Sequence, residues 1–187
     1  MISFEGYSQL LFEALEGIAE AQVEGATAVL DRVYRQDGTI YVVGNGQSAT
    51  TASAFALDLT KQTAPPPGKR RFRVVSLTDN AAALTAWAND VSYEAIFAEQ
   101  LKGLWRPDDV LLAISASGNS PNVVQACEWV REQGDVVVGL TGFTGGRVRE
   151  LADACIHVDV DDYGLVETAH IAIMHYWVDL FRERLAE

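Results

Sequence analysis

A short apolar run that turns abruptly polar is the feature that most constrains how this chain can fold. Residues 110–114 read Val-Leu-Leu-Ala-Ile, which is typical of a strand buried on both faces of a parallel sheet. Small hydroxyl side chains, a glycine and an asparagine follow, and Pro121 then begins a helical pattern with Ser120 at its N-cap position. We therefore expect a strand, a polar loop and a helix N-terminus in direct succession.

This succession is the geometry of an anion site. Unpaired backbone amides and the positive end of the helix dipole face outward from such a loop. The hydroxyls of Ser115, Ser117 and Ser120 add further donors. These serines could instead serve only as turn formers and a helix cap. Their density beside Gly118 and Asn119 favours a phosphate site built from neutral donors, because the loop contains no lysine.

A second strand, loop and helix repeat this chemistry earlier in the chain. The apolar run 39–43 leads into Gly-Asn-Gly-Gln-Ser at residues 44–48, and a helical pattern then extends to about Gln62. The spacing also matches the G-x-G-x-x-A pattern of dinucleotide sites. However, the acid expected about 20 residues further on is missing, and residues 63–73 are proline-rich and basic. We therefore rank NAD below a phosphosugar and expect no nucleotide cofactor.

The spacing of apolar runs predicts an α/β fold. Strand patterns alternate with helical patterns, which argues for a doubly wound, five-stranded parallel sheet flanked by helices in one domain spanning residues 1–187. The strands are expected at residues 39–43, 71–77, 109–115, 135–142 and 155–160. Residues 4–36 predict a long N-terminal helix, or two helices, packing on another subunit or on the protein's own sheet. Both polar loops belong at the carboxyl edge of the sheet, where ligands bind.

Composition narrows the partners and the compartment. The net charge of −12 makes nucleic acid and anionic membranes poor partners, and no apolar run approaches the length of a membrane span. Cys127 and Cys155 lie far apart in apolar stretches, and residues 1–5 lack the features of a secretory signal. We expect a reduced, cytoplasmic protein.

The last helical pattern, about residues 165–185, is apolar nearly all round but contains Glu167, His170 and His175. At about 100° per residue, Glu167 and His175 fall within about a quarter-turn of one helix face. Burying such groups without partners is costly, so one histidine is expected to be a paired core residue and the others to serve a site. Asp58, among apolar neighbours in the helix that ends near Gln62, is either a solvated acid or faces the same cleft.

Four segments together resemble the SIS (sugar isomerase) family, and in particular the phosphoheptose (sedoheptulose 7-phosphate) isomerases. They are the Gly44–Ser48 loop, Ala88-Asn89-Asp90, the Ile114–Ser120 loop and the helix from Glu167 to His175. The resemblance implies a homotetramer with sites between subunits and a serine loop that holds the sugar phosphate. It also implies conversion of D-sedoheptulose 7-phosphate to D-glycero-D-manno-heptose 7-phosphate through a cis-enediol, often with zinc present.

By position, the resemblance implies catalytic roles for Asp58 and His175, and a zinc ion would be held by these two with Glu167. It implies that a further set of residues contacts the substrate: Asn45, Gly46, Gln47, Ser48, Asn89, Asp90, Ser115, Ser117, Ser120 and Glu167. Asp58 replaces the family's glutamate, Glu167 a glutamine, Ala54 a histidine and Ala116 a threonine. These departures keep two alternatives open: a different sugar phosphate, and a non-catalytic SIS-domain protein that acts through a protein partner.

Overall fold

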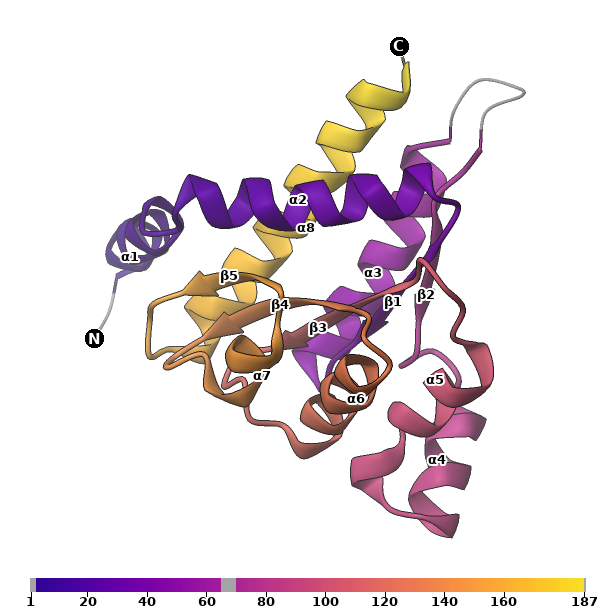
Figure 1. Cartoon of the computed structure of the whole chain (residues 1–187). Coiled ribbons are helices and arrows are strands. Elements are labelled where there is room, and N and C mark those ends of the chain that lie inside the picture. Colours follow the sequence, from indigo (N-terminus) through magenta and orange to yellow (C-terminus); the bar gives the residue numbers. More distant parts are fainter. Residues whose placement is uncertain (1–2, 65–69, 187) are drawn as a thin grey trace.

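A computed structural model describes residues 3–64 and 70–186 of the chain (Figure 1). Its centre is a sheet of five parallel strands in the order β2-β1-β3-β4-β5. The strands are β1 (Thr39–Val43), β2 (Arg73–Ser76), β3 (Val110–Ser115), β4 (Val136–Gly142) and β5 (Ala154–Val158). This confirms the predicted five-stranded parallel sheet. Residues 65–69, which form most of the proline-rich stretch noted in the sequence, lie outside the described ranges.

Helices cover both faces of this sheet, as Figure 1 shows. One face packs against α2, α3 and α8, and the other packs against α5, α6 and α7. The helices are α1 (Phe4–Glu16), α2 (Glu20–Arg35), α3 (Gln47–Gln62), α4 (Ala81–Asp90), the 3-10 turn η1 (Tyr93–Ala95), α5 (Ala98–Leu104), α6 (Pro121–Glu132), α7 (Gly146–Leu151) and α8 (Tyr163–Ala186). None of the helices in the described ranges is both long and apolar enough to cross a membrane.

The predicted long N-terminal helix is two helices. The chain leaves helical geometry between Gly17, the C-cap of α1, and Ala19, the N-cap of α2, and the two axes diverge in Figure 1. The break lets α1 pack against α8 while α2 packs along β5. Packing of this region on another subunit remains a prediction.

Residues 93–105 likewise form two short helical pieces rather than one helix. The short turn η1 comes first and α5 follows, and Ile96 and Phe97, which lie between them, are both buried. The helix α7 follows a glycine-rich turn and had no counterpart in the sequence prediction.

Trp177 fixes the relative position of α3 and α8. Its side chain is fully buried, and its ring centroid lies 5.9 Å from that of Phe55 on α3. The indole nitrogen donates a hydrogen bond of 2.9 Å to the Thr27 hydroxyl on α2. Three helices therefore share one buried side chain, and this packing holds α3 and α8 against each other beside the cavity described in the next subsection.

Candidate functional site

The two polar loops lie side by side at the carboxyl edge of the sheet. Because β1 and β3 are neighbours, with Val43 paired to Ala113, the loops that follow them meet at the point where the strand order reverses. The carboxamides of Asn45 and Asn122 join them through two reciprocal hydrogen bonds of 2.8 and 2.9 Å. Asn122 is only 1% exposed, so this pair is a buried link between the two halves of the site.

Asn122 was missed by the sequence reasoning. It is the second residue of α6, directly after Pro121, and its side chain points inward in a turn of helix where apolar residues would be expected. That position was the only available signal. The carboxamide of Asn45 is thus hydrogen-bonded within the protein, to Asn122 and also to the Tyr93 hydroxyl, which donates to its oxygen at 3.2 Å.

The serine loop, residues 115–120, is a tight turn lined with donors. Ser115 is buried at the end of β3, whereas Ser117 and Ser120 are half-buried. The Ser115 hydroxyl donates to the Ser120 hydroxyl at 3.3 Å, and the amide of Gly118 donates to the Ser115 carbonyl at 3.0 Å. Ser120 occupies the N-cap position of α6, but no side-chain hydrogen bond caps that helix in the described structure. Pro121 has no N–H and the Val123 amide donates to the Asn122 side chain at 3.0 Å, so of the first three residues of α6 only Asn122 keeps an available backbone amide.

A cavity between α3 and α8 brings together the two side chains to which the resemblance assigned catalysis. Asp58, three turns into α3, and His175 on α8 both line it, and Gln47 from the first loop lies on the same wall. The cavity has a volume of about 90 Å³. The remaining lining is apolar or hydroxylic: Thr50, Thr51, Ala54, Phe55, Ile171, Met174 and Val178. Asp58 is half-buried and His175 is exposed at the rim.

Comparison with known proteins identifies the family. Residues 3–142 match the model of the SIS domain. A phosphoheptose isomerase of Mycobacterium bovis is 41% identical over 159 residues, which are 82% of this chain and 79% of that protein. The chain belongs to the phosphoheptose isomerase family.

A relative that aligns over nearly its whole length and a solved structure both support this family. A phosphoheptose isomerase of Helicobacter pylori is 33% identical over 98% of this chain and 94% of its own length. The structure of the Neisseria gonorrhoeae phosphoheptose isomerase superposes with a TM-score of 0.86 at 30% identity, covering 95% of this chain and 94% of that one. The phosphoheptose isomerase fold therefore extends through α8, which lies beyond the residues matched by the domain model.

Glu167 lies apart from the cavity in this phosphoheptose isomerase family member. It is half-buried on α8, and burial raises the pKa of its carboxyl. Although Ile171, Met174 and His175 line the cavity, Glu167 does not. In the described ranges no three His, Cys, Asp or Glu side chains are grouped so that they could hold a metal ion. The predicted zinc ligands Asp58, Glu167 and His175 are thus not grouped as a metal site within one chain.

Asn89 and Asp90 lie in the last turn of α4, exposed, with a 2.8 Å hydrogen bond from the Asn89 amide to the Asp90 carboxylate. Neither lines the cavity between α3 and α8. The segment is nevertheless tied to the site, because Tyr93, three residues on, hydrogen-bonds to Asn45. Gly46 and Gln47 are exposed at the start of α3, and Ser48 is buried there.

His170 is a core histidine. It is 1% exposed, its Nε2 lies 3.3 Å from the Thr141 carbonyl oxygen, and its Nδ1 is buried with no partner in the described part of the chain. His157, on β5, is also buried, and its Nδ1 lies 3.1 Å from the Thr141 hydroxyl. Of the three histidines, only His175 is exposed.

These buried histidines predict acid sensitivity. Burial lowers the pKa of His170 to about 4, and burial also lowers that of His157. In the unfolded chain these histidines take up a proton near the ordinary histidine pKa of 6.5. In the folded chain they do so only at lower pH. The part of the stability that depends on these two neutral histidines is therefore fully present above about pH 6.5. It is lost as the pH falls towards about 4.

We expect the free energy of unfolding to fall by about 1–3 kcal/mol across that window. Urea unfolding followed by circular dichroism at about pH 7, 6 and 5 measures this. In His170→Gln, which cannot take up the proton, the slope should be shallower. Equal slopes in the wild type and the variant would contradict the prediction.

Proposed function

We propose that this member of the phosphoheptose isomerase family is a sugar-phosphate aldose–ketose isomerase acting on D-sedoheptulose 7-phosphate or a related sugar phosphate. The product from sedoheptulose 7-phosphate would be D-glycero-D-manno-heptose 7-phosphate. The observation that carries the proposal is the cavity that Asp58 and His175 share, beside the loop that begins α3. A carboxylate and an imidazole at one cavity are the pair of groups that such a reaction needs.

The reaction moves a proton between two adjacent carbons. A base removes the proton from the hydroxyl-bearing carbon next to the carbonyl, and an acid protonates the carbonyl oxygen, giving a cis-enediol. The proton is then delivered to the former carbonyl carbon, while the hydroxyl on the first carbon gives up its proton and becomes the new aldehyde carbonyl. We assign these two roles to Asp58 and His175, one as base and the other as acid. The apolar wall formed by Phe55 and Met174 limits the access of water to the intermediate.

The serine loop is proposed to hold the phosphate. In the described ranges, the backbone nitrogens of Ser117 and Ser120 form no hydrogen bond within the protein. The Ser120 hydroxyl accepts a hydrogen bond from the Ser115 hydroxyl, and the Ser117 hydroxyl accepts one from the backbone nitrogen of Asn119. Each of these two hydroxyls therefore keeps its own proton to donate. These donors and the N-terminus of α6 together suit a dianionic ester.

Assembly and location belong to the same proposal. We propose a homo-oligomer, a tetramer with sites between subunits, in the cytoplasm. Exposed apolar side chains support the assembly: Leu57, adjacent to Asp58, is 61% exposed, and Phe4 and Phe12 on α1 are 86% and 53% exposed. A reducing compartment is supported by Cys127 and Cys155, which are both free thiols.

A direct assay tests the function. The pure protein, treated with chelator and then assayed with and without added zinc, is incubated with sedoheptulose 7-phosphate, and formation of the aldose is followed. Turnover is expected. A lack of turnover on any pentulose, hexulose or heptulose phosphate would overturn the proposal. Binding of these esters without turnover would instead favour a non-catalytic SIS-domain protein, and a rise in melting temperature with NAD would favour a nucleotide site.

A further inference from the structure

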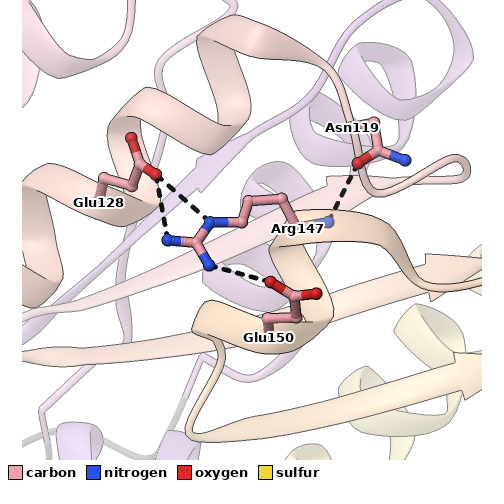
Figure 2. Close-up of polar contacts among 4 residues, drawn as sticks. All are labelled: Asn119, Glu128, Arg147 and Glu150. Carbon is pink, nitrogen blue, oxygen red and sulfur yellow. Dashed lines mark hydrogen bonds and ion pairs between the residues drawn. The ribbon is translucent and has the colours of Figure 1, made fainter.

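A neighbouring turn holds the serine loop in place from outside (Figure 2). The Asn119 side chain accepts a 3.1 Å hydrogen bond from the backbone nitrogen of Arg147. One residue earlier, the Gly118 carbonyl accepts a 2.9 Å hydrogen bond from the backbone nitrogen of Val148. We call residues 145–148, which begin α7, the α7 turn. It contacts the loop at two successive residues and restrains it independently of β3 and α6.

Glycines on both sides allow this close approach. Gly118, Gly145 and Gly146 all have positive φ, at 67°, 84° and 52°. A Cβ on Gly118 would lie 1.8 Å from the Gly145 carbonyl oxygen, and a Cβ on Gly146 would lie 2.5 Å from the Asn119 amide nitrogen. Real Cβ atoms do not come this close, so backbone packs directly on backbone here and leaves little freedom to the loop.

The Arg147 guanidinium ties the α7 turn to α6 as well. Figure 2 shows the side chain extending away from Asn119 towards two carboxylates. Its nitrogens lie 3.4 Å from Glu128, on α6, and 2.9 Å from Glu150, on α7. The side chains of Arg147 and Glu128 are about half exposed and that of Glu150 is 67% exposed, so these ion pairs contribute little stability. The backbone contacts to residues 118 and 119 are therefore the main restraint on the loop.

The carboxamide of Asn119 also acts inside the loop. Its amide nitrogen donates a 3.0 Å hydrogen bond to the Ser117 carbonyl, while its oxygen is held by Arg147. A carbonyl oxygen directed at a phosphate would repel it, because both carry negative charge. In this structure the Ser117 carbonyl is instead directed at the side-chain amide of Asn119, and the unpaired donors of the loop are left for an anion.

We propose that Asn119 is a positioning residue for phosphate binding: fixed by the α7 turn, it orients the Ser117 peptide without itself contacting the substrate. This inference rests on the proposed function, because it assigns the shape of the proposed phosphate loop to a residue outside the donor set. It predicts an effect on binding of the phosphate ester, with little effect on the chemical step between α3 and α8.

Asn119→Ala and Asn119→Asp test this. Alanine removes both side-chain hydrogen bonds, and aspartate keeps an acceptor for Arg147 but presents an oxygen to the Ser117 carbonyl. For each variant we expect KM for sedoheptulose 7-phosphate to rise about tenfold, with kcat within about twofold. Inhibition by inorganic phosphate should weaken in parallel. A merely structural role would lower the unliganded melting temperature without this separation of KM from kcat.

Two further variants separate the loop contact from general effects. Gly146→Ala leaves Asn119 in the sequence but places a methyl group against its amide, so it should raise KM in the same way. Glu150→Gln is the matched control: it weakens an exposed ion pair of the same arginine but leaves the backbone contacts of the α7 turn intact, so KM should stay within about twofold.

An unchanged KM in both Asn119 variants, or a loss confined to kcat, would overturn the inference. So would a wild-type protein whose melting temperature does not rise with phosphate. Failure of the proposed function looks different: no sugar phosphate is turned over, yet phosphate raises the wild-type melting temperature and Asn119→Ala abolishes that rise. In that case the positioning role stands without the isomerase activity.

Discussion

Asp58→Asn is expected to lower kcat about 1,000-fold while leaving KM within a few-fold of the wild type. The substitution keeps the size and shape of the side chain but removes the carboxylate that we propose exchanges a proton with the substrate, and general acid–base groups contribute factors of roughly 100 to 10,000. KM should change little because the proposed phosphate-binding residues belong to the serine loop, and none of them lines the cavity that Asp58 lines.

The fold should tolerate this change. In the described ranges, no hydrogen bond or ion pair involves the Asp58 carboxylate, and the side chain is only half-buried. Lys61→Gln, one turn further along α3, is the matched control because it replaces a charged side chain by its neutral amide on the same helix but does not line the cavity. Steady-state kinetics on sedoheptulose 7-phosphate make the comparison. An Asp58→Asn protein that keeps more than about a tenth of the wild-type kcat would contradict the assignment.

Replacing His175 in the Asp58→Asn variant should lower kcat by less than the same replacement does in the wild type. If Asp58 and His175 act as base and acid in one proton transfer, a protein lacking either has already lost the concerted step. The Asp58→Asn, His175→Gln double variant should therefore retain about the residual rate of the slower single variant. Full multiplicativity of the two losses would indicate that the groups act in separate steps.

Trp177→Ala is expected to lower the free energy of unfolding by about 3–5 kcal/mol. Trp177 is fully buried between α2, α3 and α8, and it is the largest of the fully buried side chains. Its removal leaves a cavity against Phe55 and deletes the hydrogen bond to Thr27. Thr27 itself stays paired, because its hydroxyl also donates to the Val23 carbonyl at 2.6 Å. Most of the lost free energy of unfolding should therefore come from lost packing contacts.

Urea unfolding and thermal melting measure this effect. Trp177→Phe keeps an aromatic ring but removes the indole donor, so it should lower the free energy of unfolding by about 1–2 kcal/mol. The difference between the two variants separates the contribution of the hydrogen bond from that of the buried volume. The alanine variant should also melt about 10 °C lower. A loss below about 1 kcal/mol for alanine would mean that the three-helix contact does not stabilise the fold as described.

The sequence predicted the parts of this structure that depend on local pattern. The run Thr39–Val43 forms a strand with the predicted bounds, because an apolar segment buried on both faces leaves no other arrangement in a parallel sheet. The serine loop and the start of α6 at Pro121 follow from helix-end chemistry in the same way. The fold class and the carboxyl-edge position of both loops could therefore be inferred without coordinates.

Contacts between distant segments could not be inferred. Angular position on a helix placed Glu167 near His175, but the two are eight residues apart, which is about 12 Å along the axis. A shared helix face does not bring side chains together at that distance, so Glu167 lies off the cavity. The contact of the α7 turn with Asn119 likewise depends on three-dimensional packing, as does the break between α1 and α2 near Gly17, where tertiary contacts decide the end of each helix.

The hydrogen-bonded pair Asn45 and Asn122 has a consequence for the order of folding. The two residues are 77 positions apart, so the entropy of closing a long loop must be overcome before they can meet. An amino-terminal fragment ending before β3 would contain Asp58 but would lack both the serine loop, proposed to hold the phosphate, and His175. Substrate-binding competence should thus appear late in refolding, after most of the secondary structure has formed.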